Sequence, residues 1–135
     1  LKAKPQARIR GVLVEKMVMD GEEVILGLKR DPLFGPVIMF GMGGIYVEVF
    51  RDVSFRIAPA TKDSIAEMIR QIKTYPVLTG IRGKAARDIE SVEVCVQRLS
   101  QLAADCPDIM ELDINPLVVE EKGRGCFVLD ARIII

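Results

Sequence analysis

The most informative stretch of this 135-residue sequence is Glu111-Leu112-Asp113-Ile114-Asn115-Pro116-Leu117. In a strand, successive side chains point to opposite faces, so the polar residues at 111, 113 and 115 share one face. The leucine and isoleucine between them share the other face. This alternation predicts a strand with one polar face and one face in the core.

A second strand is predicted to pair with this one. The segment from Cys126 to Ile134 contains Asp130 and follows turn-forming residues at 120–125. A hairpin that turns near Gly123 places Asn115 within about one residue of Asp130. An Asp beside an Asn, with no His or Cys, offers the oxygen ligands that Mg²⁺ prefers. The alternative is that Asp130 caps a strand end or accepts backbone hydrogen bonds.

The rest of the chain predicts strands first and helices afterwards. Hydrophobic patterns and turn residues indicate a strand from Ile9 through Val14, followed by a hairpin turn at Asp20-Gly21. Further strands are indicated at Val24–Leu28, Val37–Phe40, Val53–Ala58 and Ile109–Val119. A helix capped by Thr61 should stop before Tyr75-Pro76, and another should run from Asp88 to Pro107. This order predicts an α+β fold, with an antiparallel or mixed sheet and two main helices on one face.

The composition excludes several classes of function. Lys+Arg and Asp+Glu both number 19, so the chain lacks the basic excess of proteins that bind nucleic acid or anionic membranes. The absence of histidine excludes His-activated nucleophiles, zinc sites with His ligands and a phosphohistidine on this chain. Uncharged runs are too short to span a bilayer. Three widely spaced cysteines, Cys95, Cys106 and Cys126, suggest small buried hydrophobes in a reducing cytoplasm, not a disulfide or metal framework.

Two familiar phosphate-binding motifs fail. A P-loop ending at Gly83-Lys84 would need glycine where Leu78 stands and Ser or Thr where Ala85 stands. The run Gly41-Met42-Gly43-Gly44 begins like a dinucleotide fingerprint but meets Tyr46 at the final glycine position. A glycine-rich stretch after a strand still lets backbone approach a ligand closely, or it forms only a tight turn.

Six segments in one order nevertheless resemble a known family, the ATP-grasp domain of the NDP-forming acyl-CoA synthetases. The family includes the ADP-forming acetyl-CoA synthetase β subunit and, more distantly, the succinyl-CoA synthetase β subunit. The matching segments are residues 14–18, 21–27, 29–36, 41–44, 111–117 and 129–131. The resemblance implies the C-terminal lobe of an ATP-grasp fold, with a mostly antiparallel sheet, at residues 9–135. Residues 1–8, which contain Lys2, Lys4 and Arg8 and no acid, are expected to be a basic leader or linker.

The resemblance also implies how the nucleotide, ATP or ADP, is bound. Residues 15–18 match the hinge that holds adenine, through the side chain of Glu15 and the backbone of Lys16 and Val18. Such a hinge reads the adenine edge with backbone groups. Glu23 matches the position that hydrogen-bonds the ribose. From the residues alone, both glutamates would be ordinary exposed strand positions.

The phosphate end of the site is implied by further matches. Asn115 and Asp130 match the Mg²⁺ ligands, in agreement with the predicted hairpin. Asp113 stands where relatives usually have Glu, and it is expected to support phosphoryl transfer. Gly43 and Gly44 match a glycine-rich loop near that site. Separately, Lys29 and Arg30 either neutralise phosphate charge or lie on a solvated face.

Several parts of the family's machinery are missing from these residues. The N-terminal lobe with its phosphate-contacting lysine, the phosphohistidine and the CoA-binding domains have no match. The chain begins at Leu1 and stops within an apolar run, so we expect it to be part of a longer protein, inactive alone, whose apolar open surface favours self-association. CoA would bind on other domains.

The function implied is that of an ADP-forming acid-thiol ligase. Its overall reaction is acyl-CoA + ADP + phosphate ⇌ carboxylic acid + ATP + CoA, through acyl phosphate and phosphohistidine. An alternative is the ATP-grasp-like regulatory or binding module of a bacterial protein acetyltransferase. A third interpretation is a degenerate structural lobe that binds no nucleotide.

Overall fold

A computed structural model describes residues 8, 10–44, 51–81 and 83–135. Its elements follow one another as β1 (Glu22–Asp31), β2 (Gly35–Met42), β3 (Val53–Ile57), α1 (Lys62–Gln71), α2 (Tyr75–Thr79), α3 (Ile89–Asp105), β4 (Glu111–Val119), β5 (Cys126–Val128) and β6 (Ala131–Ile134). The strands form one sheet in the order β3-β2-β1-β4-β5, with β6 also paired to β4. Every pair between these strands is antiparallel.

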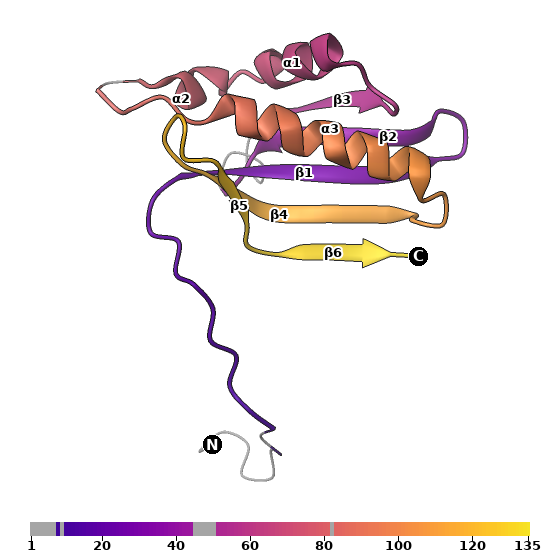
Figure 1. The fold of residues 1–135 in the computed structure, drawn as a ribbon. Helices are drawn as coiled ribbons and strands as arrows, with labels where there is room; N and C mark the ends of the chain where they lie inside the picture. The colour runs from indigo at the N-terminus through magenta and orange to yellow at the C-terminus, as the bar shows by residue number, and fades with distance from the viewer. Residues whose placement is uncertain (1–7, 9, 45–50, 82) are drawn as a thin grey trace.

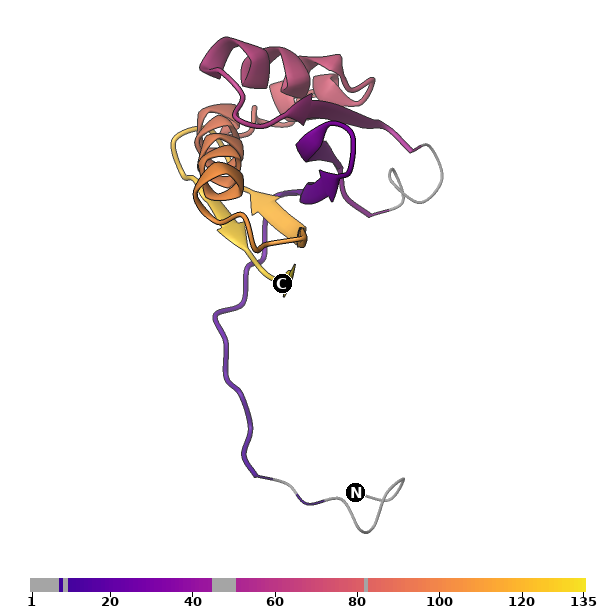
Figure 2. The same cartoon turned by 90° about the vertical axis from the view of Figure 1, so that its right-hand side faces the viewer.

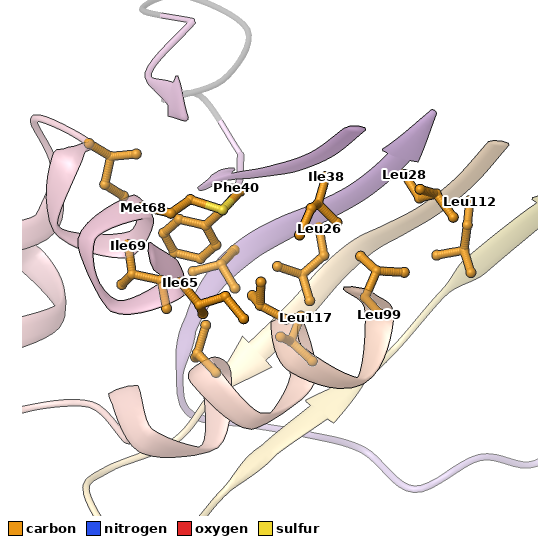
Figure 3. Close-up of a cluster of buried hydrophobic side chains, with 14 of the residues drawn as sticks. Leu26, Leu28, Ile38, Phe40, Ile65, Met68, Ile69, Leu99, Leu112 and Leu117 are labelled. Carbon is orange, nitrogen blue, oxygen red and sulfur yellow. The ribbon is translucent and has the colours of Figure 1, made fainter. Parts of the chain in front are cut away.

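The helices cover one face of the sheet and leave the other face open (Figures 1 and 2). Alternate residues of β1 point into the covered face, and Val24, Leu26 and Leu28 are at most 3% exposed. Figure 3 shows side chains from β1 and β2 packed against those of α1 and α3. Burial of this apolar area holds the two layers together. No helix among the described residues is long and apolar enough to cross a membrane.

The two main helices begin where their capping residues predict. Thr61 Oγ1 accepts a hydrogen bond from Ser64 N at 3.3 Å, and Asp88 Oδ1 accepts one from Ser91 N at 3.1 Å. These bonds satisfy N–H groups that the first helical turn leaves unpaired. The sequence did not predict the five-residue helix α2, although proline near the first position of a helix is favourable. The described residues thus contain the two main helices that the sequence predicts and one short helix between them.

The prediction of a strand at residues 9–14 is wrong for residues 10–14, which the structure describes. The segment at 10–19 has no strand, and it leaves the sheet (Figure 1). Val12, Leu13 and Val14 are 81–89% exposed. An alternating pattern makes a strand only when a neighbouring strand supplies hydrogen bonds and a face to pack on, and no described strand lies beside this segment. Ile9 lies outside the described residues.

The predicted pairing of Asn115 with Asp130 is confirmed. Asn115 N donates to Asp130 O at 3.1 Å, and the same register continues through β6 and β5. The second strand of this hairpin is interrupted at 129–130, which separates β5 from β6.

The opposite side of β4 contains an irregularity that the sequence did not predict. Leu26 pairs with Ile114 and Val24 pairs with Leu117, so Ile25 of β1 faces two residues of β4. Such a bulge shifts the alternation of side chains by one position. The expected alternation therefore ends at Asn115, and Leu117 and Val119 return to the core, each at most 1% exposed.

Candidate functional site

The open face of the sheet contains a shallow groove of about 560 Å³. One side of it is apolar and is formed by Val37, Met39 and Phe55 of β2 and β3. The other side is polar and includes Asp113 of β4 and Arg132 of β6. The groove therefore offers an apolar wall beside charged side chains, a surface suited to a polar ligand with a flat or apolar part.

Asn115 and Asp130 lie next to this groove on adjacent parts of the hairpin. Their backbones are hydrogen-bonded, and both residues are exposed. Amide and carboxylate oxygens are ligands for hard cations such as Mg²⁺. In the part of the chain that the structure describes, no three acidic, Cys or His side chains gather as a metal site, here or elsewhere. A cation here would therefore rely on one carboxylate, one amide and oxygens from its ligand or water.

Asp113 and Arg132 form the next row along the same face. Asp113 is paired in register with Arg132 on one side and with Gly27 on the other. Both charged side chains are exposed and line the groove. Arg132 was not among the residues predicted from the sequence. Its position two residues after Asp130 was an available signal, because the strand period of two places both on one face.

Glu23 and the glycine-rich segment meet at the other end of β1. Gly43 N donates to Glu23 O at 2.7 Å. A Cβ atom at position 43 would lie 2.9 Å from the Cβ of Glu23, so only glycine permits this approach. Gly44 has a φ of +60°, in the region that favours glycine, and lies near the Glu23 carboxylate. The structure therefore brings three of the predicted site residues together.

The residues predicted to hold adenine lie on the segment that leaves the sheet. Lys16 Nζ is 4.8 Å from the centre of the Phe127 ring, a distance typical of a cation–π contact. Phe127 pairs with Val118, and Val118 pairs with Glu23. Lys16 thus contacts one end of a row of paired residues across the sheet, and Glu23 lies at the other end of that row. Glu15 is exposed and Val18 is half-buried.

Neither role expected for Arg30 fits its contacts. Its guanidinium donates to Ala103 O at 2.6 Å and Cys106 O at 2.9 Å, and its Nε donates to Ile109 O at 2.8 Å. These carbonyls lie at and just beyond the end of α3, where cations are favourable. Arg30 therefore caps α3 on the covered side, where it is half-buried, and does not lie on the open face with Lys29. Lys29 forms an exposed ion pair with Glu111 at 3.0 Å.

The chain belongs to the ATP-grasp domain family, whose model matches residues 1–135. It is 53% identical over 132 residues to the 4-hydroxybutyrate–CoA ligase [ADP-forming] of Nitrosopumilus maritimus, covering 98% of this chain and 19% of that protein. It is 47% identical over 132 residues to the acetate–CoA ligase [ADP-forming] I subunit beta of Pyrococcus furiosus, covering 98% of this chain and 56% of that subunit. The chain thus spans from about a fifth to just over half the length of these relatives.

Solved structures give the same relationship. An acetyl-coenzyme A synthetase 1 of Candidatus Korarchaeum cryptofilum, in complex with coenzyme A and Ca-AMPCP, superposes with a TM-score of 0.89 at 44% identity, covering 99% of this chain and 58% of that chain. Another structure of that synthetase contains coenzyme A and Mg-AMPPCP and superposes with a TM-score of 0.83 at 45% identity, covering 87% and 55%. The predicted fold class and the predicted family are both confirmed.

Proposed function

We propose that this chain is the nucleotide- and Mg²⁺-binding C-terminal lobe of an ADP-forming acyl-CoA synthetase. The observation that carries the proposal is the pairing of Asn115 with Asp130 on the open face of a sheet that resembles those of nucleotide-bound synthetases. The whole protein would interconvert acyl-CoA, ADP and phosphate with carboxylic acid, ATP and CoA. The phosphohistidine named for the Korarchaeum synthetase would belong to another segment, because this sequence contains no histidine.

The residues of the open face suit Mg²⁺ and the phosphates of a nucleotide. Asn115 and Asp130 would hold the ion, because both offer hard oxygen atoms and both are exposed on adjacent branches of the hairpin. When bound, Mg²⁺ would neutralise negative charge on the phosphates. Arg132 would donate charge-assisted hydrogen bonds to a phosphoryl oxygen in the groove. Asp113, which faces Arg132 in the ladder, would orient that guanidinium.

The remaining predicted residues suit the nucleoside end. Glu23 would accept hydrogen bonds from the ribose hydroxyls, with Gly43 and Gly44 letting the backbone approach closely. Lys16 and Val18 would contact the adenine through backbone groups, and Glu15 would contact it through its side chain. A bound nucleotide would extend along the strands, because the residues proposed to contact it follow one another along one face. Their order is Lys16, Glu23, Asn115 and Arg132. Positioning and charge neutralisation then supply most of the catalysis in a phosphoryl transfer.

The open face implies a covering partner in the larger protein. Phe55 and Ile57 of β3 are 54% and 55% exposed, and Phe34 of the β1–β2 turn is 63% exposed. Apolar side chains gathered on one face typically mark an interface. We assign this face to an N-terminal ATP-grasp lobe, which would close over the nucleotide. The CoA-binding domains would lie on the same or a partner chain, and the lobe alone would self-associate and not turn over substrate.

The proposal is tested with Asp130→Asn in the full-length protein. The variant should fold normally and lose nucleotide-dependent formation of acyl-CoA, because an amide is a weaker cation ligand than a carboxylate. Asp108→Asn is the matched control, since Asp108 is exposed at the other end of β4. Turnover is measured at several Mg²⁺ concentrations, and folding is followed by circular dichroism. Unchanged turnover in Asp130→Asn at low Mg²⁺ would overturn the assignment of Asp130.

A further inference from the structure

Two of the three cysteines come together across two elements. Cys95 lies on α3 and Cys126 begins β5, and their Sγ atoms are 3.4 Å apart. Both residues are half-buried and both thiols are free. The distance is that of a thiol–thiol hydrogen bond and is longer than a disulfide bond. Cys106, at the end of α3, is likewise free and half-buried but has no such neighbour among the described residues.

The two sulfur atoms are held in place by interactions that do not involve them. Asp88, the cap of α3, also accepts hydrogen bonds through Oδ2 from Gly123 N at 3.0 Å and Gly125 N at 2.8 Å. Cys126 directly follows Gly125 and pairs with Val119 in the sheet. Cys95 lies on the same helix, about two turns beyond Asp88. The carboxylate of Asp88 thus fixes both sides of the cysteine pair, so little reorganisation is needed to bring the sulfurs into reaction distance.

The two thiols differ in acidity in the way that a reactive pair requires. A hydrogen bond from the Cys95 thiol lowers the pKa of Cys126 to about 6, against the opposing effect of burial, and Ser91 adds a smaller stabilisation of the thiolate. The same interaction, with burial, raises the pKa of Cys95. The charge of Asp88 raises the pKa of Cys126 and the charge of Arg98 lowers the pKa of Cys95, each by less than the other causes. The directions of the two shifts favour Cys126 as the attacking thiolate and Cys95 as the thiol that follows it.

We propose that Cys95 and Cys126 form a reversible thiol-modification site that low-molecular-weight disulfides oxidise to an intramolecular disulfide. The Cys126 thiolate attacks one sulfur of the disulfide, which forms a mixed disulfide and releases one small thiolate. The Cys95 thiol then loses its proton to that thiolate or to water and attacks Cys126 Sγ. The second small thiolate leaves and is protonated. The protein loses two hydrogen atoms, and the small disulfide is reduced to two thiols.

This bond would link α3 to the hairpin that carries Asp130. Cys126 lies four residues before Asp130, on the same branch of the hairpin. The inference does not depend on the nucleotide site, because it rests on the sulfur geometry and on Asp88. A failure of the redox test would therefore not contradict the proposed function. A failure of the Asp130→Asn test would likewise not contradict the proposed cysteine site.

The test exposes the complete protein to oxidised glutathione at pH 7, followed by alkylation and tryptic digestion without reduction. Cleavage after lysine and arginine places Cys95 in residues 88–98 and Cys126 in residues 125–132, while Cys106 lies in residues 99–122. We expect the first two peptides to become linked in the wild type and in Cys106→Ser, with the link removed by dithiothreitol. In Cys95→Ser, we expect a glutathione adduct to persist on Cys126, because no second thiol can displace it.

The control measurements separate this site from general cysteine reactivity. Circular dichroism of each variant checks that the serine substitutions leave the fold intact, and the wild-type peptide map answers the question without any variant. A wild type that accumulates glutathione on Cys126 with no linked peptide would overturn the proposal. Absence of any reaction at Cys126 under conditions that modify Cys106 would also overturn it.

Discussion

Asp88 is predicted to stabilise two parts of the structure at once. Its carboxylate caps α3 through Ser91 N and holds the β4–β5 turn through Gly123 N and Gly125 N. The turn leads to the strand that ends before Asp130. Substitution of Asp88 should therefore lower the stability of the fold and loosen the hairpin that carries the proposed metal ligands.

The size of the effect follows from the three hydrogen bonds. Loss of a helix cap costs about 1 kcal/mol. Each bond from a backbone N–H to a charged acceptor contributes about 1.5 kcal/mol, somewhat less where water reaches the half-buried carboxylate. Asp88→Ala should thus lower the free energy of unfolding by about 3 kcal/mol. For a chain of this length, that corresponds to a fall in Tm of about 10 °C.

A second substitution separates the two roles. Asp88→Ser keeps a good capping group but cannot reach both glycine N–H groups, so it should cost about 2 kcal/mol. Thr61→Ala, which removes the single capping bond of α1, should cost only about 1 kcal/mol. Urea unfolding of the four proteins, followed by circular dichroism, gives the comparison. If Asp88→Ser were as stable as the wild type, the hydrogen bonds to the hairpin would contribute nothing and the reasoning would be refuted.

Three further predictions concern other single residues. Arg30→Met should lower the free energy of unfolding by about 2–3 kcal/mol in urea titrations, because three carbonyls at and just beyond the end of α3 lose a charged donor; equal stability of the two proteins would refute this. Burial raises the pKa of the Asp52 carboxyl, but hydrogen bonds from Thr74 and from the N–H of Lys73 outweigh it and hold the pKa below its usual value. Asp52 therefore stabilises the fold above about pH 4, the unfolded pKa, and this stabilisation is lost as pH falls through the lowered pKa; Asp52→Asn should show a smaller loss of Tm on acidification. Gly43→Ala should weaken nucleotide binding in isothermal titration calorimetry of the full-length protein, because its Cβ would press on Glu23, whereas Gly11→Ala, with open space around it, should bind as the wild type does.

Much of the fold could be predicted because its signals are local. The alternation at 111–115 depends only on which side chains share a face of a strand. The pairing of Asn115 with Asp130 follows from one turn of defined length between two strands. The predicted cap Thr61 acts within its own first helical turn, and the second main helix begins near Asp88 as predicted. Each of these predictions required only neighbours in sequence.

The features that the sequence did not predict depend on partners distant along the chain. Arg30 reaches carbonyls more than seventy residues away, and nothing in the local sequence distinguishes it from an exposed lysine or arginine of a strand. The alternating segment before Gly21 has the sequence pattern of a strand, yet no described strand pairs with it. The bulge opposite Ile25 changes the face of every later residue in β4, because pairing with β1 and not periodicity decides the register.

The sequence by itself determined the two main helices, most of the strands, the hairpin that joins Asn115 to Asp130 and, through a set of short matches, the family. The tertiary structure alone decided which face remained open, and it placed Glu23, Asp113 and Arg132 on that face with Asn115 and Asp130. It also brought Cys95 to Cys126 across thirty-one positions of sequence. The physical reason is that periodicity assigns a residue to a face, whereas only the packing of helices on the sheet decides whether that face is buried or exposed.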